Sequence, residues 1–200
     1  LAGCGTTNTS TGGPDSSSST PMTLTAATHA APTSASTDWT TYHHDNTRAG
    51  SIVTTPDPHS LTSTWSTQLD GAVFAEPLVV GTHVFIATEG DSIYALDSQT
   101  GKVQWHTNVG TPVPLSSLPC GNIDPLGITG TPVYDPQTGL IFAVAEVTGP
   151  QHILVGINAS TGKISVRRSV DPAGSDARAH QQRAALALSQ GKVYVAFGGL

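Results

Sequence analysis

The sequence predicts an all-β fold made of short antiparallel strands. Two observations predict it. Charged residues are only 11% of the 200 residues, whereas the chain contains 21 Gly and 14 Pro and is rich in Ser and Thr. Low charge combined with many turn-forming and β-branched residues favours strands joined by tight turns. In addition, short apolar runs separated by Gly-containing turns recur along the chain, which indicates repeated hairpins.

The first copy of this repeat divides into four predicted strands. They are Leu78–Val80, Val84–Thr88, Ser92–Leu96 and Val103–Trp105. A continuous apolar run such as 84–87 indicates a strand that is covered on both faces. Stacking of several four-stranded sheets provides this cover.

Two further copies follow. The second copy comprises the segments 131–135, 140–145, 153–158 and 160–164, and the third comprises 183–188 and 193–197. Repeats of this length built from four strands are typical of a β-propeller. We therefore expect residues 38–200 to form a partial β-propeller of about two and a half four-stranded antiparallel blades.

Composition also argues against several classes of partner. The net charge of −6 comes from scattered residues, and the eight Lys and Arg form no basic stripe, so nucleic acid is not an expected partner. No run of 18 apolar residues is present in the sequence, so no membrane-spanning helix is predicted within it. The two cysteines, Cys4 and Cys120, form no C-x-x-C pair, and no metal site is predicted.

The first residues suggest attachment to a membrane. Residues 1–4 read Leu-Ala-Gly-Cys, which resembles a bacterial lipobox, the remnant of a signal peptide whose Cys carries lipid. About half of residues 5–37 are Ser or Thr, and such a segment buries too little apolar surface to fold. We therefore expect Cys4 to be the lipid attachment site, followed by a disordered tether over residues 5–37.

One motif links the repeats to a known family. Ala95, Asp97, Thr100, Gly101 and Trp105 stand at the spacing of the tryptophan-docking motif, and the chain resembles the PQQ-like (quinoprotein-like) β-propellers. An Asp accepts backbone N–H groups across a tight turn, and a Gly adopts positive φ at low cost. The resemblance implies that Trp105 lies between neighbouring blades, where its ring supplies apolar contact.

The second copy keeps only part of this motif. It retains Asn158, Thr161 and Gly162, but Gly156 replaces the Ala and Val166 replaces the Trp. The turn is therefore expected to persist with weaker docking. Before the first blade, residues 39–50 also resemble the start of these propellers, and we expect the adjacent His43 and His44 to belong to a packed aromatic turn rather than to a metal site.

The resemblance leaves the function open. Quinoprotein dehydrogenases of this kind hold pyrroloquinoline quinone with two adjacent cysteines, a flat Trp and a calcium ion, but this sequence has no Cys-Cys pair. We therefore expect no cofactor and a non-enzymatic binding or scaffold protein, lipid-anchored on the extracytoplasmic side of the cell membrane. The alternatives are a quinone-dependent alcohol or sugar dehydrogenase whose site lies mostly beyond residue 200, with quinone and calcium, and a carbohydrate-binding or sensor propeller.

Two long loops are candidates for binding a protein or small molecule at the propeller face. In the loop 112–130, the oxygens of Asn122 and Asp124 suit a hard cation, although an Asx-turn is the favoured interpretation. The loop 169–182 is followed by Arg183. A ligand in the central channel and a solvated loop explain its polar end equally well. The residues at that end are His180, Gln181, Gln182 and Arg183.

Repeat register adds one candidate, and a cysteine adds another. Glu76 is equivalent to Thr131 and Arg183, so the three are expected on one rim of the channel. Cys120 is interpreted as a buried small residue, a free thiol or half of a disulfide. In an extracytoplasmic protein the disulfide is favoured, with a cysteine beyond this sequence.

Overall fold

A computed structural model describes residues 37–51 and 60–199. These residues belong to one compact unit, Ser36–Leu200. The predicted lipid attachment residue Cys4 and residues 5–36 of the predicted tether lie outside the described residues. Within them the chain forms β-strands and two short 3-10 helices, which confirms the predicted all-β fold of partial propeller blades.

The first blade is a four-stranded antiparallel sheet with its strands in chain order. Its strands are β1 (Leu78–Val80), β2 (His83–Thr88), β3 (Ser92–Asp97) and β4 (Val103–Asn108). The last strand runs three residues beyond its predicted end at Trp105, because residues 106–108 keep pairing with the start of β3.

The second blade repeats this plan. Its strands are β5 (Val133–Asp135), β6 (Leu140–Val147), β7 (Gln151–Asn158) and β8 (Ile164–Ser169). In the first blade Ala95 pairs with Trp105, and in the second Gly156 pairs with Val166. A register shift follows each pair, after Ala95 and after Gly156. The two sheets are therefore residue-by-residue counterparts, as the repeat predicts.

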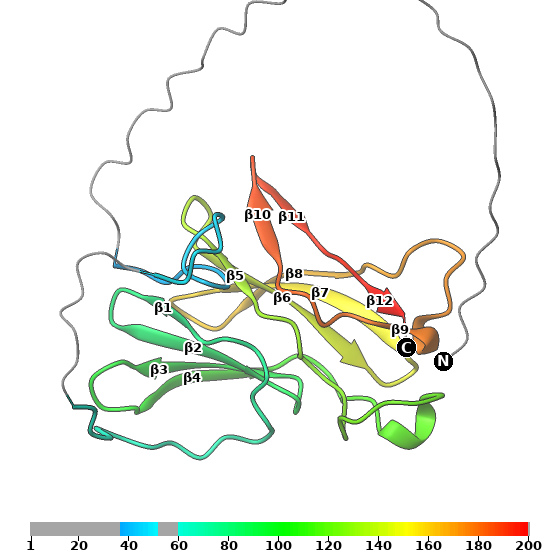
Figure 1. Cartoon of the computed structure of the whole chain (residues 1–200), viewed down its shortest axis with the longest axis horizontal. Helices are drawn as coiled ribbons and strands as arrows, with labels where there is room; N and C mark the ends of the chain where they lie inside the picture. Colours follow the sequence, from blue (N-terminus) through cyan, green and yellow to red (C-terminus); the bar gives the residue numbers. More distant parts are fainter. Residues whose placement is uncertain (1–36, 52–59, 200) are drawn as a thin grey trace, which may run out of the picture. The chain divides into compact units, whose positions relative to one another are not determined.

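The two blades lie side by side (Figure 1) and share one apolar core. Ala87 and Ile93 of the first blade pack in the same cluster as Ala143, Ala145 and Val155 of the second. Several of these positions are Ala, and small side chains allow two sheets to approach closely. The continuous apolar runs of the sequence thus correspond to strands covered on both faces.

The third repeat differs from the expected strands. Its strands are β9 (His180–Gln181), β10 (Ala187–Ser189), β11 (Lys192–Tyr194) and β12 (Gly198–Gly199). They form two separate two-stranded pairs, β10 with β11 and β12 with β9. The predicted strand at 193–197 is therefore shorter, because the chain leaves β11 after Tyr194 and pairs with β9 instead. Leu186, 1% exposed, packs this repeat onto Val133 and Val144 of the second blade.

Tryptophan docking joins consecutive blades. The indole Nε1 of Trp105 donates to the carbonyl of Ala159 at 2.9 Å, and the hydroxyl of Thr107 donates to the carbonyl of Gly162 at 2.6 Å. Trp105 of the first blade therefore docks on the turn of the second blade, and not on the turn of its own repeat.

The turn of the first blade receives a different tryptophan. The indole Nε1 of Trp65 donates to the carbonyl of Ser98 at 3.0 Å, and Thr67 donates to the carbonyl of Gly101 at 2.6 Å. Residues 65–67 thus repeat the contacts of residues 105–107. Sequence reasoning did not identify Trp65, although the shared Trp-x-Thr pattern was visible.

The Asp or Asn that opens each turn organises it in the same way. One carboxylate oxygen of Asp97 accepts the amides of Gln99 and Thr100, and the side-chain oxygen of Asn158 accepts those of Ser160 and Thr161. The glycines that close the two turns have φ of 69° and 72°. These contacts are those expected of the motif chemistry.

The segment before the first blade is tied to the repeats. Trp39 forms an antiparallel bridge with Val79, and Arg48 donates to the carbonyl of Leu186 at 3.1 Å. The His43 ring stacks on Tyr42 with ring centroids 3.9 Å apart. His43 has φ of 56° and His44 has φ of 78°. These residues lie in a turn that contains the aromatic stack, as expected.

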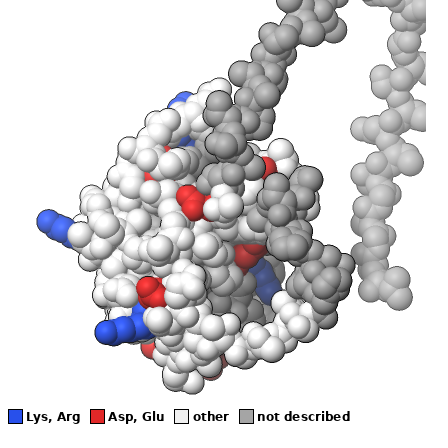
Figure 2. All heavy atoms as spheres, turned by 90° about the vertical axis from the view of Figure 1, so that its left-hand side faces the viewer, with Lys and Arg blue, Asp and Glu red and all other residues white. Residues whose placement is uncertain are grey.

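Charge is sparse on the surface. Figure 2 shows one face on which the Lys and Arg side chains lie at separate points and form no stripe. Among residues 37–51 and 60–199, no helix is long and apolar enough to cross a membrane.

Docking of Trp105 on the turn of the second blade predicts different stability losses for two Gly→Ala substitutions. A Cβ at Gly162 (φ 72°) would lie 2.8 Å from the Trp105 ring, whereas a Cβ at Gly139 (φ 68°) would meet nothing within 4 Å. Gly139→Ala should cost about 1–2 kcal/mol for the left-handed backbone alone. Gly162→Ala should cost roughly 1–3 kcal/mol more, since it also overpacks the contact. Urea melts measure both changes, and equal losses would contradict docking of Trp105 on this turn.

Candidate binding site

The candidate site lies where the hairpins of both blades turn, at the end of each sheet remote from the docking turns. A long connection, residues 109–132, passes from the first blade to the second at this end. It contains the 3-10 helix η1 (Leu115–Ser117). Gly127 in this connection donates its amide to Glu89 Oε2 at 2.6 Å and accepts the amide of Glu146 at 3.2 Å. The connection is thus held against both blades.

Three carboxyl groups are buried under this connection. Glu89 is 2% exposed, Asp91 is fully buried and Glu146 is 3% exposed. Apart from the Gly127 bond, their oxygens have few partners. Glu89 Oε1, both carboxylate oxygens of Asp91 and Glu146 Oε1 form no hydrogen bond with the described residues. Buried polar atoms without partners cost stability, so this group is a departure from an ordinary core.

Burial and the charges of neighbouring carboxylates raise the pKa of two of these acids, Asp91 and Glu89. Burial raises the pKa of Asp91 to about 8, and the neighbouring carboxylates of Glu89 and Glu146 add to this effect. Burial also raises the pKa of Glu89, against the opposing effects of the Gly127 amide, the nearby Thr129 hydroxyl and Arg183. Asp91 is thus kept largely protonated near neutral pH.

A buried histidine connects the second blade to the loop after it. His152 is fully buried, with Nδ1 2.7 Å from Asp171 Oδ1 and Nε2 3.3 Å from Glu146 Oε2. Burial alone lowers the pKa of His152, but the two carboxylates outweigh it and the pKa is raised. The His152 ring also meets Phe197 edge-on at 4.9 Å. The contact of His152 with Asp171 holds the loop 169–182 on β7, and its contact with Phe197 holds the third repeat there.

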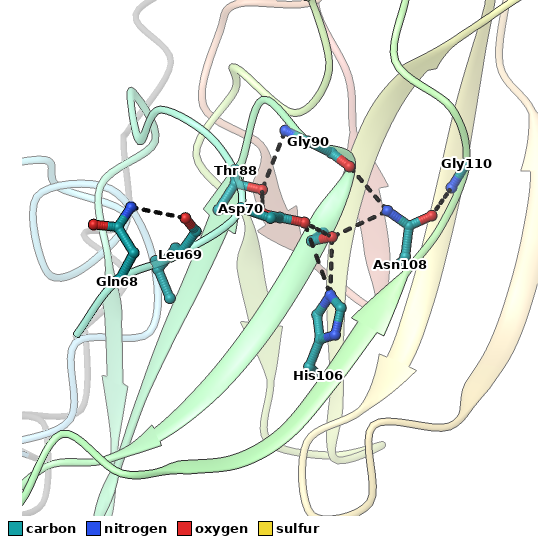
Figure 3. A network of polar contacts seen from close by, with 9 residues as sticks. Gln68, Leu69, Asp70, Thr88, Gly90, His106, Asn108 and Gly110 are labelled. Carbon is teal, nitrogen blue, oxygen red and sulfur yellow. Dashed lines mark hydrogen bonds and ion pairs between the residues drawn. The ribbon is translucent and has the colours of Figure 1, made fainter.

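A second polar network surrounds Asp70 (Figure 3). Asp70 accepts the hydroxyls of Thr88 at 2.7 Å and Ser92 at 2.5 Å, and Ser92 also lies 3.0 Å from Nε2 of His106. Asn108 completes the network by donating to the Gly90 carbonyl at 2.9 Å. The network fixes the chain before β1 on the first blade.

The Asp, His and Ser of this network lack the arrangement of a catalytic triad. A triad carboxylate orients the histidine through Nδ1, whereas Asp70 faces Nε2 of His106 at 3.9 Å and bonds the serine directly. Ser92 is also fully buried, so its hydroxyl is closed to a substrate. In the part of the chain that the structure describes, no group of three or more His, Cys, Asp or Glu is arranged to hold a metal.

Two open cavities lie at this end of the blades, and both are lined by Phe74. One has a volume of about 360 Å³ and is lined by Tyr42, Phe74, Thr129, Thr131, Arg183 and Ala185. The other has a volume of about 250 Å³, and its lining includes Asp70, Phe74, Glu89, Asn122, Ile123 and Asp124. Phe74 is 54% exposed. An exposed aromatic side chain that combines with nearby polar and apolar groups is typical of a recognition surface.

Three of the sequence-identified residues line these cavities. Asn122 and Asp124 line the smaller cavity, and Arg183 lines the larger. Asp124 Oδ1 accepts the amide of Leu115 at 3.0 Å, so this carboxylate braces the loop across nine residues and not across the two of an Asx-turn.

Glu76 lies beside Thr131 but lines neither of the two cavities. Its carboxylate accepts Trp39 Nε1 at 2.5 Å and the amide of His43 at 3.3 Å, so it fastens the segment before the blades. The repeat register did identify one contact, since the Glu76 amide donates to the hydroxyl of Thr131 at 3.0 Å.

The other identified residues of the third repeat serve the loop itself. Nδ1 of His180 lies 2.8 Å from the carbonyl of Asp176, and Gln181 pairs with Gly198. Gln182 is 4% exposed and donates to the carbonyl of Ala184 at 2.6 Å. Cys120 is exposed and unpaired with any described residue, which contradicts its interpretation as a buried residue. Its pairing with a more distant cysteine stays a prediction.

The buried acids and their neighbours were missed by sequence reasoning. They are Asp70, Phe74, Glu89, Asp91, Glu146, His152 and Asp171. One signal was present: Glu89 and Glu146 each follow the apolar run of a second strand, at matched positions of the repeat. Because charged residues at strand ends are usually exposed, their burial depends on the connection folded over them.

Comparison with known proteins places the fold among quinoprotein-like propellers. The profile of the family described as outer membrane protein assembly factor BamB matches residues 46–198. No curated protein matches the chain. Among solved structures, the chain is similar to BamB from Moraxella catarrhalis, with 24% identity, a TM-score of 0.40, and coverage of 64% of this chain and 32% of that chain.

A dehydrogenase shares the fold as well. Quinohemoprotein alcohol dehydrogenase ADHIIG from Pseudomonas putida HK5 is 18% identical with a TM-score of 0.57, over 81% of this chain and 23% of that chain. The chain thus spans a third or less of either relative. At this identity the likeness concerns the fold alone.

The raised pKa of Asp91 predicts that the free energy of unfolding depends on pH. Its pKa is about 8 in the folded state against an ordinary 3.8, so the folded protein binds a proton that the unfolded chain releases between about pH 4 and 8. Its contribution to the free energy of unfolding therefore falls as pH rises through this window. Asp91→Asn keeps the shape without the charge, and Asn tolerates the left-handed backbone.

We expect Asp91→Asn to change stability little at pH 4 and to stabilise by at least about 1.4 kcal/mol at pH 8, the equivalent of one pKa unit. Urea melts from pH 4 to 9 provide the measurement. Exposed Asp176 serves as the control, because Asp176→Asn should leave the pH profile unchanged. A wild-type profile parallel to that of Asp91→Asn would contradict the raised pKa.

Proposed function

The chain belongs to the family of outer membrane protein assembly factor BamB, and from this premise we propose that it is a non-enzymatic scaffold that binds a protein partner. The observation that carries the proposal is the pair of cavities that share the exposed Phe74. They combine apolar surface with fixed polar groups, as a recognition surface does. The family match supports a protein as the partner, since the family description is that of an assembly factor.

The alternative of a quinone-dependent dehydrogenase has less support. The likeness to the alcohol dehydrogenase concerns the fold. These 200 residues contain no vicinal cysteine pair that would hold the quinone. The described acids at the cavities bond loop amides and hydroxyls, and they do not converge as calcium ligands. The residues present do not fit the quinone site, and we propose that the protein works without a cofactor.

We further propose that the protein is anchored by lipid on the extracytoplasmic side of a membrane. The Leu-Ala-Gly-Cys sequence and the polar residues 5–37 support this location. A single lipid-modified residue followed by a flexible tether holds a domain close to a bilayer without a membrane-spanning helix.

The anchor is tested by replacing each cysteine in turn. Cys4→Ala in the precursor should move the protein from the membrane fraction to the soluble fraction, because the lipid is lost. Cys120→Ala is the matched control and should leave it with the membranes. Fractionation and mass spectrometry of the N-terminal peptide provide the readout. Membrane association of Cys4→Ala equal to that of the wild type would exclude the anchor.

The absence of redox chemistry is tested with the cofactor itself. The purified protein is incubated with pyrroloquinoline quinone and calcium and then passed through gel filtration. We expect no quinone absorbance in the protein peak and no dye-linked oxidation of alcohols or sugars. Stoichiometric quinone in that peak would support the dehydrogenase. Chemical cross-linking in intact membranes should in addition give a discrete adduct with another protein if the scaffold function is correct.

A further inference from the structure

We propose that the two cavities form one groove for an extended segment of the protein partner, in which an apolar side chain stands between a basic and an acidic one. This inference rests on the proposed function, because it takes the occupant to be a protein. It goes beyond that function by naming the chemistry of the bound segment and the residues that bind each part of it.

One end of the groove is acidic. Asp70, Glu89 and Asp124 line the smaller cavity together with Ile123 and Pro125. Asp124 is exposed, and its Oδ1 accepts the Leu115 amide at 3.0 Å, so the carboxylate is held in place by the loop. A cavity of about 250 Å³ has room for the stem of a Lys or Arg side chain against the apolar residues, with its charge near the carboxylates.

A buried and unpartnered carboxyl oxygen supports a cationic occupant at this end. Glu89 lines the cavity, is 2% exposed, and its Oε1 forms no hydrogen bond with the described residues. The Thr129 hydroxyl also lies near this carboxyl group. An N–H donor of a bound segment would supply the missing partner, and hydrogen bonds to charged groups are among the stronger ones.

The other end of the groove is basic. Arg183 is exposed and lines the larger cavity, and its charge also acts on the carboxyl group of Glu89. Arg183 shares this cavity with Thr129, which is 5% exposed. A guanidinium group binds carboxylates through two parallel N–H donors, and a neighbouring hydroxyl adds a third donor. This end therefore suits an Asp or Glu side chain.

An exposed apolar surface joins the two ends. Phe74 lines both cavities and is 54% exposed. The backbone on either side of Phe74 is fixed. The amide of Glu89 donates to the carbonyl of Ala72 at 2.9 Å, and the amide of Glu76 donates to the hydroxyl of Thr131. Phe74 is thus presented on a rigid segment, which reduces the entropy lost on binding an apolar side chain.

The order of charges selects the occupant. A small cation or anion uses only one end of the groove, whereas a segment with both charges and an apolar residue between them uses all of it. Fluorescent capped peptides test this directly. Each carries Leu flanked by Lys on one side and Asp on the other, at two spacings and in both orders. Two comparison peptides keep only one charge, with Asn in place of Asp or Gln in place of Lys. A third, uncharged peptide has both replacements.

We expect at least one two-charge peptide to bind the intact protein at least ten-fold more tightly than the uncharged peptide in fluorescence polarisation. The single-charge peptides should fall between them, and added salt should weaken the difference. Equal affinity for all the peptides, or no binding of any, would overturn the proposal.

Matched variants locate the binding. Phe74→Ala should weaken the two-charge peptide at least five-fold, whereas Tyr194→Ala, at a residue 53% exposed, should not. Asp124→Asn should remove the preference for Lys, with Asp176→Asn as control, because each aspartate accepts one backbone amide. Arg183→Gln should remove the preference for Asp, with Arg168→Gln as control. All six residues are exposed, and thermal melts verify folding.

Failure of this inference is distinguishable from failure of the scaffold function. A membrane cross-link that forms equally with wild type and Phe74→Ala would place the partner elsewhere and exclude the groove, while the scaffold function stands. Retention of quinone would exclude the scaffold function whatever the peptides do.

Discussion

The fold depends on the contact between a tryptophan of one blade and the turn of the next. Trp65 and Trp105 each donate to a turn carbonyl, and two residues later a threonine donates to the carbonyl of the turn glycine. The glycine must be in the left-handed region and must lack a Cβ, because the indole ring occupies that space. One interaction therefore fixes the turn conformation, the spacing of the blades and their orientation. Where Val166 replaces the Trp, Leu186 and neighbouring aliphatic residues join the second blade to the third repeat.

Docking at one end of the sheets leaves the other end free for polar groups. A strand of six residues is roughly 20 Å long, so about this distance separates the docking end of a blade from its far end. At the far end the connection 109–132 covers Glu89 and Glu146 and binds both through Gly127. A core built for stability alone would not retain three carboxyl groups with unpartnered oxygens. Of the three, Glu89 lines the smaller cavity, where an unpartnered carboxyl oxygen suits the proposed recognition of a partner.

The sequence was informative where the physical determinants are local. The strands of the first two blades, the Asp- or Asn-centred turns and the left-handed glycines follow from runs of a few residues. Trp65 was accessible by the same reasoning, since residues 65–67 repeat the Trp-x-Thr pattern of 105–107. The burial of Glu89 and the position of Glu76 are different. Each depends on a segment far away in the chain, Gly127 for the first and Trp39 for the second, and no local pattern encodes such a contact.

The same distinction explains which candidate residues came together. Asn122 and Asp124 stood out because their side-chain oxygens lie in a long loop, and Arg183 stood out because it follows another long loop. Their common feature in space is Phe74, an apolar residue that has no unusual neighbours in the sequence. It lies between them because the Asp70 network fixes the chain before β1 on the first blade, while the loop and the third repeat close in from either side. The proposed groove is therefore a product of blade stacking. Substitutions that loosen the docking turns would change the groove without touching any residue that lines it.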